Sequence, residues 1–177
     1  SVTTMYGMFN RLAYFSSSVI LDLSGWNTSN VTDMNYMFTF AGYNASTFSL
    51  GNLSGWNTSK VSLMGEMFSM AGYSATTFDL GNVGTWDVSN LTTMYNFFYN
   101  SGRNATTWNV GDLSNWDTSK VTNMSNMFSD CGYEATSWSI GTLTNWKTGN
   151  VTKMDKMFNN TCYNYNYNNN FLLVIIF

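Results

Sequence analysis

The chain has 177 residues, of which 44% are hydrophobic and 18% are aromatic, while only 10% are charged. The apolar content is sufficient for a sizeable core, and solubility must depend on uncharged polar side chains. The net charge of −3, with seven basic residues spread along the sequence, argues against nucleic acid as a partner. Histidine, the commonest general base and metal ligand, does not occur, so we expect no metal, no cofactor and no catalysis.

Tryptophan recurs every thirty residues along most of the chain. A fixed period of about 20 to 50 residues is typical of stacked repeat proteins. The recurring residues are Trp26, Trp56, Trp86, Trp116 and Trp146. We therefore predict one repeat domain over residues 1–158, with coils of thirty residues that begin at Leu23, Leu53, Val83, Leu113 and Leu143.

After each tryptophan, apolar residues stand at positions i, i+3, i+6 and i+7, as in Val31, Met34, Met37 and Phe38. This spacing places them on one face of a helix of about two turns. Residues that can cap a helix start precede the run, and Gly42 follows it at a position suited to a helix end. We expect a short helix in every coil, with the Met and Phe side chains in the core.

A second segment of each coil alternates polar and apolar residues, which is typical of a strand. These segments cover residues 46–50, 76–80, 106–110 and 136–140. Successive coils would pair their strands in parallel at a spacing of about 4.8 Å. The predicted fold class is an α/β solenoid of leucine-rich-repeat type, with a parallel β-sheet on one face and short helices on another.

The row of tryptophans has two interpretations. Aromatic faces can stack on sugar rings, so an exposed row predicts a carbohydrate-binding module, whereas a residue type that repeats in every coil is also what core packing produces. We favour the core, and the burial of Trp86 and Tyr73 is the observation that separates the two. A second aromatic column, interrupted by an arginine, is a candidate interaction surface and contains Tyr43, Tyr73, Arg103 and Tyr133.

Cys131 and Cys162 are the two cysteines of the sequence. They fall in neighbouring columns of consecutive coils, which places them roughly 5 to 6 Å apart and within reach of a disulfide. We predict a Cys131–Cys162 disulfide, and two buried thiols are the alternative.

Among many Asn-x-Ser/Thr sequons, Asn44 and Asn104 lie in the loop after the predicted helix, where we expect a glycan to reach in a secreted eukaryotic protein.

The sequence changes character after Phe158. Residues 159–170 form a connector rich in Asn and Tyr, and residues 171–177 form an apolar, β-prone segment that is shorter than the 20 or so residues of a membrane-spanning helix. Neither end carries a polar cap, so we expect either a chain excised from a longer protein or ends covered by neighbouring protomers. The candidate assembly strand consists of Phe171, Leu172, Leu173, Val174, Ile175, Ile176 and Phe177.

The segment from Trp116 to Phe128 reads Trp-Asp-Thr-Ser-Lys-Val-Thr-Asn-Met-Ser-Asn-Met-Phe. It resembles the signature repeat of bacterial and mycoplasmal surface lipoproteins and of BspA-like leucine-rich-repeat surface proteins, and the resemblance covers most of the chain. The resemblance implies an extracellular or cell-surface setting and a role in adhesion or in binding host or matrix proteins. The present repeat is longer than the usual unit of the family, and it has Leu53 or Val83 where the family pattern has Asn.

These features predict a non-enzymatic, extracellular or cell-surface repeat protein with a structural or adhesive role. Its expected partners are its own copies, arranged head to tail in a filament, or a host or matrix protein. A carbohydrate-binding module is the alternative. An enzyme would need two carboxylates within about 10 Å in a cleft. Asp87 and Asp117 share a column, but capping of a helix start explains them more simply.

Overall fold

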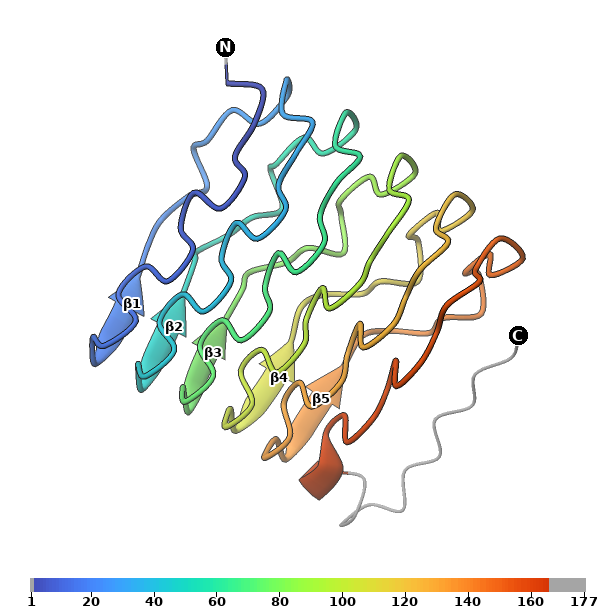
Figure 1. Ribbon diagram of the computed structural model, residues 1–177. Coiled ribbons are helices and arrows are strands. Elements are labelled where there is room, and N and C mark those ends of the chain that lie inside the picture. Colours follow the sequence, from blue (N-terminus) through green and yellow to red (C-terminus); the bar gives the residue numbers. More distant parts are fainter. Residues whose placement is uncertain (1, 166–177) are drawn as a thin grey trace.

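The computed structural model describes residues 2–165. Each thirty-residue unit forms one layer, and the layers are stacked along a single direction with the short strands side by side at one edge (Figure 1). Backbone hydrogen bonds join residues of consecutive layers throughout the stack. The predicted assembly strand over residues 171–177, and part of the predicted connector, lie outside the described residues.

Four strands are confirmed at the predicted positions and a fifth, β1, lies in the first layer, but each strand is only three residues long. They are β1 (Ser18–Ile20), β2 (Thr47–Ser49), β3 (Thr77–Asp79), β4 (Thr107–Asn109) and β5 (Ser137–Ser139). Paired strands are parallel, with Phe48 opposite Phe78 and Trp108 opposite Trp138. The central residue of each strand points into the core and its two neighbours point outward, as the alternating pattern predicted.

The strands form two sheets, β1-β2-β3 and β4-β5, in place of the one continuous sheet that the repeat suggests. On the far side of each layer, parallel bridges join Thr4 to Asp33 and Asp33 to Leu63, and a second series begins at Thr93. Neither edge has a bridge between residues 53–82 and residues 83–112 in the described chain. We call this interruption the seam.

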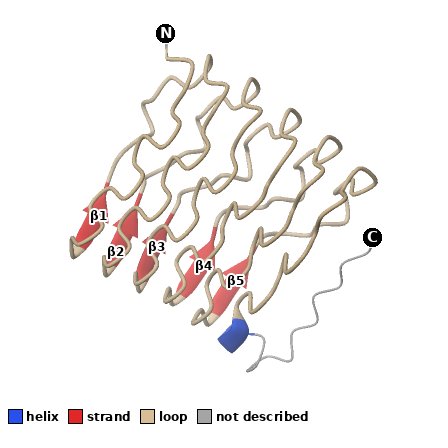
Figure 2. Cartoon of the chain, in the orientation of Figure 1, coloured by secondary structure: helices blue, strands red, loops and turns tan. Residues whose placement is uncertain are grey.

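The predicted short helices are wrong, because residues 31–44 and their equivalents form a series of tight turns (Figure 2). Within one layer, Met37 N donates to Met34 O at 3.3 Å, and Ala41 N donates to Phe38 O at 2.9 Å. Tyr36 and Phe40 adopt positive φ angles of 58° and 57°. A right-handed helix requires negative φ at every residue, so these two positions exclude it.

The turns leave alternate N–H groups free to join the layers. Met34 N donates to Leu63 O at 2.8 Å, Tyr36 N to Gly65 O at 3.0 Å, and Phe38 N to Met67 O at 2.9 Å. An α-helix would use these N–H groups internally and leave none for the neighbouring layer. The requirement for N–H donors in both directions also accounts for the absence of proline from the sequence, since proline has no N–H.

The core fills the space between the strand edge and the turn edge. The valine, methionine and phenylalanine of the turns are fully buried in the interior layers, as predicted. Phe38 stacks on Phe68 with ring centres 5.5 Å apart, and Phe68 stacks on Phe98 at 5.7 Å. Equivalent residues of successive layers therefore pack against one another, which explains why the same side chain recurs in each copy.

Candidate functional site

The predicted interaction surface is a continuous row of stacked side chains along the stack. We call it the tyrosine–arginine strip, and it consists of Tyr14, Tyr43, Tyr73, Arg103, Tyr133 and Tyr163. Tyr43 stacks on Tyr14 at 4.9 Å and on Tyr73 at 4.7 Å between ring centres, with the rings nearly parallel. Tyr133 stacks on Tyr163 at 5.1 Å. The structure therefore brings the predicted residues together in one strip.

Arg103 continues the strip where a tyrosine is missing. Its guanidinium carbon lies 4.1 Å from the centre of the Tyr133 ring and 5.8 Å from the centre of the Tyr73 ring. A cation over an aromatic face is attracted by the negative charge of the ring face. The arginine thus takes the place of a ring between two tyrosines and leaves a positive charge on this surface.

A glycine precedes each strip residue of the interior layers and sets its position, whereas Ala13 and Cys162 take this place before Tyr14 and Tyr163. Gly42 has a φ of +57°, and a Cβ atom there would lie 2.7 Å from Cδ2 of Phe48. Only glycine allows the backbone to turn this closely over the strand side chains. The tyrosine that follows is then held at the surface, half-buried by its two neighbours.

Mutual stacking determines which parts of the tyrosines reach solvent. Partial burial, followed by the neighbouring Tyr73 and Tyr14, raises the pKa of Tyr43 above its ordinary value. The flat faces of Tyr43 are covered by rings on both sides, so the ring edge and the hydroxyl group are the parts available for contact. The strip therefore presents hydroxyl groups and one guanidinium group.

The tryptophan row belongs to the core. Trp56, Trp86 and Trp116 are 4%, 3% and 1% exposed, and only the terminal Trp26 and Trp146 are half-buried. The indole N–H of Trp86 donates to Leu53 O at 3.0 Å. Since a sugar ring needs an exposed aromatic face, the burial of Trp86 removes this row as a carbohydrate platform. The interpretation of the row as core is confirmed.

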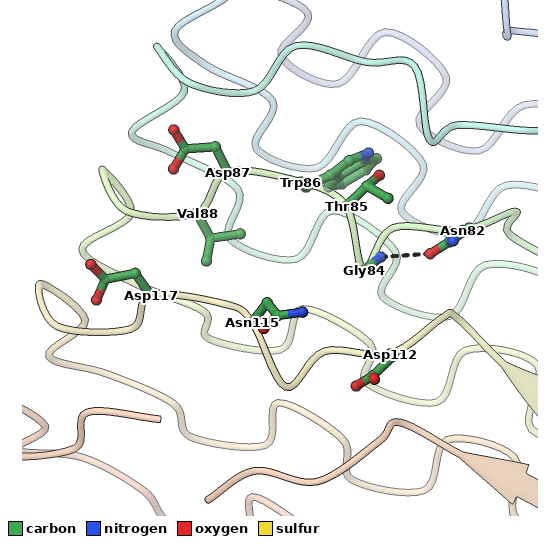
Figure 3. Close-up of a pocket in the computed structure, with 9 residues that line it drawn as sticks. All are labelled: Asn82, Gly84, Thr85, Trp86, Asp87, Val88, Asp112, Asn115 and Asp117. Atoms are coloured by element: carbon green, nitrogen blue, oxygen red, sulfur yellow. Dashed lines mark hydrogen bonds between the residues drawn. The ribbon is translucent and has the colours of Figure 1, made fainter. Parts of the chain in front are cut away.

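An open groove of about 620 Å³ lies beside the tryptophan segments of two layers (Figure 3). Its polar lining includes Asp87, Asp112 and Asp117. Backbone and side-chain hydrogen bonds from Ser114 hold the pKa of Asp112 below its ordinary value. Hydrogen bonds from Ser119, with a smaller effect of Lys147, lower the pKa of Asp117. Asp112 accepts from Ser114 N at 2.9 Å within its own turn. Asp87 and Asp117, which we predicted to cap helix starts, likewise accept from Ser89 N at 2.9 Å and Ser119 N at 3.1 Å, so they cap turns and not helices.

The sequence comparisons agree with the repeat geometry. The family described as "Mycoplasma protein of unknown function, DUF285" matches residues 1–102 and residues 71–171. The chain belongs to this family. The two matches overlap because the same thirty-residue unit is repeated. No curated protein and no solved structure matches the chain.

The predicted disulfide is not formed in this family member, and both cysteines are free and buried. Cys162 N donates to Cys131 O at 3.1 Å, so the two residues do lie in consecutive layers as predicted. Burial raises the pKa of both thiols well above the ordinary value. The structure therefore has the arrangement that we gave as the alternative, two buried thiols.

The sequon asparagines lie beside the tyrosine–arginine strip. Asn44 is exposed, and Asn104 is half-buried. The backbone N–H of Asn44 donates to Tyr14 O at 3.1 Å, and that of Asn104 donates to Tyr73 O at 3.2 Å. These bonds occupy the backbone and leave the side-chain amide of Asn44 accessible, so its glycosylation stays a prediction.

Glu66 is a site residue that the sequence analysis missed. Desolvation raises the pKa of its carboxyl group, and a hydrogen bond from Asn96 partly opposes the shift. The same column holds Tyr36, and Glu66 is the main cause of the raised pKa of its hydroxyl group. The signal available in the sequence was a polar residue that varies from copy to copy inside an otherwise constant apolar motif.

No helix in the described chain has the length and apolar character needed to cross a membrane. Among residues 2–165, no group of three or more acidic or cysteine side chains is arranged to hold a metal ion.

Proposed function

We propose that this chain is a non-enzymatic structural and adhesive repeat protein of the extracellular space or the cell surface, wound as a solenoid of the leucine-rich-repeat type. The observation that carries the proposal is the tyrosine–arginine strip. It is a long surface row built from one residue per layer, and it is stacked at 4.7 to 5.1 Å wherever two tyrosines adjoin. A rigid, periodic row of this kind suits contact with an extended partner.

The chemistry of the strip favours a host or matrix protein over a glycan as the partner. Tyrosine and arginine are enriched among the residues that dominate protein–protein binding. A sugar would need an open ring face, and the faces of Tyr43 are occupied by Tyr14 and Tyr73. A carbohydrate-binding module is therefore the less favoured proposal.

The proposed absence of catalysis is supported by the carboxylates of the open groove. General acid catalysis near neutral pH uses a carboxyl group with a raised pKa, and those of Asp112 and Asp117 are lowered. Both carboxylates also bind the N–H groups of their own turns. This arrangement supports a structural role for the groove residues.

The proposal is tested by binding to immobilised matrix proteins and to a glycan panel. A double variant, Tyr73→Ser with Arg103→Ser, should weaken protein binding by roughly tenfold or more, since the side chains at the centre of such contacts dominate the affinity. The matched control is Tyr95→Ser, which alters a tyrosine that is 38% exposed and lies outside the strip. Glycan binding that survives the double variant, without protein binding, would support the carbohydrate-binding module.

We also propose that copies of the chain assemble end to end. Repeat proteins of this kind need covered ends.

A further inference from the structure

Arg103 interrupts the tyrosine–arginine strip with a charged group that is held in place on both sides. Its guanidinium carbon lies 4.1 Å from the ring centre of Tyr133 and 5.8 Å from that of Tyr73. The backbone before it is fixed as well, since Gly102 has a φ of +48° and a Cβ atom there would lie 2.6 Å from Cγ of Phe78. The guanidinium group is therefore positioned before any partner binds.

The guanidinium group of Arg103 has hydrogen-bond donors but no acceptor. Among residues 2–165 it makes no ion pair and no hydrogen bond. Its five N–H donors lie in one plane, and the rings of Tyr73 and Tyr133 lie on either side of the group, in the layers before and after. The donors therefore remain available to an oxyanion that approaches from solvent.

Lysines elsewhere on the surface differ from Arg103 in this respect. The amino group of Lys60 donates to Oδ1 of Asn30 at 2.7 Å. That of Lys147 pairs with Asp117 at 3.2 Å. The described chain thus supplies an oxygen acceptor to these two cations, and it supplies only aromatic rings to Arg103.

Two carboxylates lie in the layer after Arg103, and both already accept hydrogen bonds. The side chain of Asn160 donates to Asp130 at 3.0 Å, and that of Asn164 donates to Glu134. Neither carboxylate forms an ion pair with Arg103. Their charge and the net charge of −3 repel a polyanion such as a sulfated polysaccharide. These surroundings favour a ligand that brings a single carboxylate.

Apolar side chains border the strip in the layers before Arg103. Phe40 contacts Tyr43 with ring centres 5.8 Å apart. Met70 is the equivalent of Phe40 in the next layer, and both side chains are half-buried. The layers that follow have polar residues at this position. A segment that lies along the strip would therefore meet apolar surface first and then the cation.

We propose that Arg103 binds the carboxylate of one acidic side chain in an extended, otherwise apolar segment of the partner protein. This proposal rests on the strip as the binding surface, as proposed above, and specifies what the partner brings to it. An arginine and a carboxylate form two parallel hydrogen bonds, which are stronger than bonds between neutral groups. The hydroxyl groups of Tyr73 and Tyr133 have no hydrogen-bond partner among residues 2–165, so they are further donors on this surface.

The proposal is tested by titrating the full chain with two end-blocked peptides, Ser-Leu-Glu-Leu-Ser and Ser-Leu-Gln-Leu-Ser. The NMR signal of the Arg103 Nε–H group reports the contact. The Glu peptide should shift this signal and should bind at least about tenfold more tightly than the Gln peptide, because a charge-assisted pair replaces a neutral contact. A heparin oligosaccharide is the third probe, and it should bind more weakly than the Glu peptide because it is a polyanion.

Three variants separate the charge from the shape of the arginine. Arg103→Tyr introduces the residue that other layers have at this place, and it should bind the two peptides equally. Arg103→Lys keeps the charge but loses the planar fork, so it should retain only part of the preference for the Glu peptide. Lys60→Gln is the matched control, because it removes a positive charge outside the strip and should leave the preference intact. Thermal unfolding checks that all three variants fold.

Equal binding of the two peptides, or no shift of the Arg103 signal at millimolar concentrations of the Glu peptide, would overturn the proposal. A preference for the Glu peptide that survives in Arg103→Tyr would also overturn it. Tighter binding of the heparin oligosaccharide than of the Glu peptide would overturn it in favour of a sulfated glycan.

The panel of matrix proteins tests the adhesive function separately. A matrix protein that binds Arg103→Tyr as tightly as the natural chain, but binds Tyr73→Ser more weakly, would support the strip and overturn the carboxylate contact. A preference for the Glu peptide that depends on Arg103, without binding to any matrix protein, would support the carboxylate contact and count against the adhesive function.

Discussion

The guanidinium carbon of Arg103 lies 4.1 Å from the centre of the Tyr133 ring, in a row where the other layers have tyrosine. The first prediction follows from this contact. Arg103→Ser should lower the free energy of unfolding by about 0.5 to 1 kcal/mol, the range of a partly exposed cation–aromatic contact. Arg103→Tyr should lose less, because a ring can stack on both neighbours as in the rest of the strip.

Urea unfolding of the two variants measures this difference. Lys120→Ser is the control, because Lys120 is exposed and its amino group donates to Oδ1 of Asn90 at 2.7 Å on the surface. Its effect should stay below about 0.5 kcal/mol. If Arg103→Tyr were the more damaging of the two strip variants, then the arginine would have a specific role beyond filling a place in the stack.

The second prediction concerns the buried tryptophan row. Trp86→Phe keeps an aromatic ring but removes the donor to Leu53 O. It should lower the free energy of unfolding by about 0.5 to 1.5 kcal/mol, the net contribution of one hydrogen bond, since Leu53 O keeps its bond from Trp56 N at 3.1 Å. Trp26→Phe should have a smaller effect, because Trp26 is half-buried. Equal effects at Trp26 and Trp86, measured by urea unfolding, would contradict the assignment of the row to the core.

The repeat explains why so much of the fold could be predicted from the sequence. A thirty-residue period predicts parallel stacking of equivalent residues, and Phe48 lies opposite Phe78 as that requires. Burial follows from the same argument, because a residue type that recurs in every copy packs against itself. The columns of Met34 and Phe38 are accordingly buried.

The turns could not be predicted, because the spacing of Val31, Met34, Met37 and Phe38 fits a helix as well as the observed turns. A helix and this series of turns differ in the sign of φ at alternate residues. The positions with positive φ are occupied by residues such as Tyr36 and Phe40, whose side chains do not indicate a left-handed conformation.

The disulfide that we predicted and that does not form is a similar case. The spacing placed Cys131 and Cys162 in neighbouring layers, but it does not determine the direction of the two side chains.

Part of the candidate site was also predictable. The periodicity identified the column of Tyr43, Tyr73 and Tyr133 and the interruption at Arg103. The rings lie close enough together to cover one another's faces and to leave only their edges exposed. Their separation depends on the rise per layer and on the turn of the backbone at Gly42. Those quantities need coordinates, and they decide whether the strip suits a protein or a sugar.

The third prediction separates turns from helices by the sign of a glycine substitution. Lys156 is exposed and has a φ of 53°, in the left-handed region. Lys156→Gly should therefore leave the free energy of unfolding unchanged or raise it by up to about 1 kcal/mol, because glycine adopts this conformation without strain. In a helix, the same change would lower it by about 1 kcal/mol.

Lys153→Gly is the matched control for this prediction. Lys153 is also an exposed lysine of the last layer, but it pairs in a parallel bridge with Asn123 and has no positive φ. Glycine should therefore be destabilising there. Urea unfolding of both variants checks the difference, and a loss of stability at Lys156 as large as at Lys153 would contradict the turn structure.

The fourth prediction is a pH dependence that comes from Glu66. Desolvation raises the pKa of its carboxyl group in the folded state, so the folded protein binds a proton more readily than the unfolded chain does. The stabilising effect of this proton is fully present below the ordinary carboxyl pKa and is lost as the pH rises through the raised pKa. Glu66→Gln should therefore be more stable than the natural protein at neutral pH.

The advantage of Glu66→Gln should shrink as the pH falls from neutral to below the ordinary carboxyl pKa. The free energy of unfolding of both proteins, measured at several pH values, gives the difference directly. Glu134→Gln removes a negative charge from an exposed position and controls for the change in net charge. A constant advantage at every pH would mean that desolvation of the Glu66 carboxylate is not the cause.

The fifth prediction concerns the seam between residues 53–82 and residues 83–112. The backbone N–H groups of Met34, Met94 and Met124 each donate to the following layer at 2.8 Å. Met64 is the equivalent residue at the seam, and its buried N–H has no acceptor in the described chain. Glu66 N, Phe68 N and Met70 N still donate across the seam at 2.7 to 3.0 Å. A buried donor without a partner is destabilising by about 1 to 3 kcal/mol, so the backbone should open more readily at Met64 than at the equivalent residues of the other layers.

Amide hydrogen exchange under native conditions tests this weakness residue by residue. The amide of Met64 should exchange at least about tenfold faster than those of Met34, Met94 and Met124, since tenfold corresponds to about 1.4 kcal/mol of opening free energy. These three amides serve as internal controls, because they occupy the same place in their own layers. Equal protection at all four positions would show that the missing hydrogen bond of Met64 and the unpaired edges of β3 and β4 have no effect on local stability.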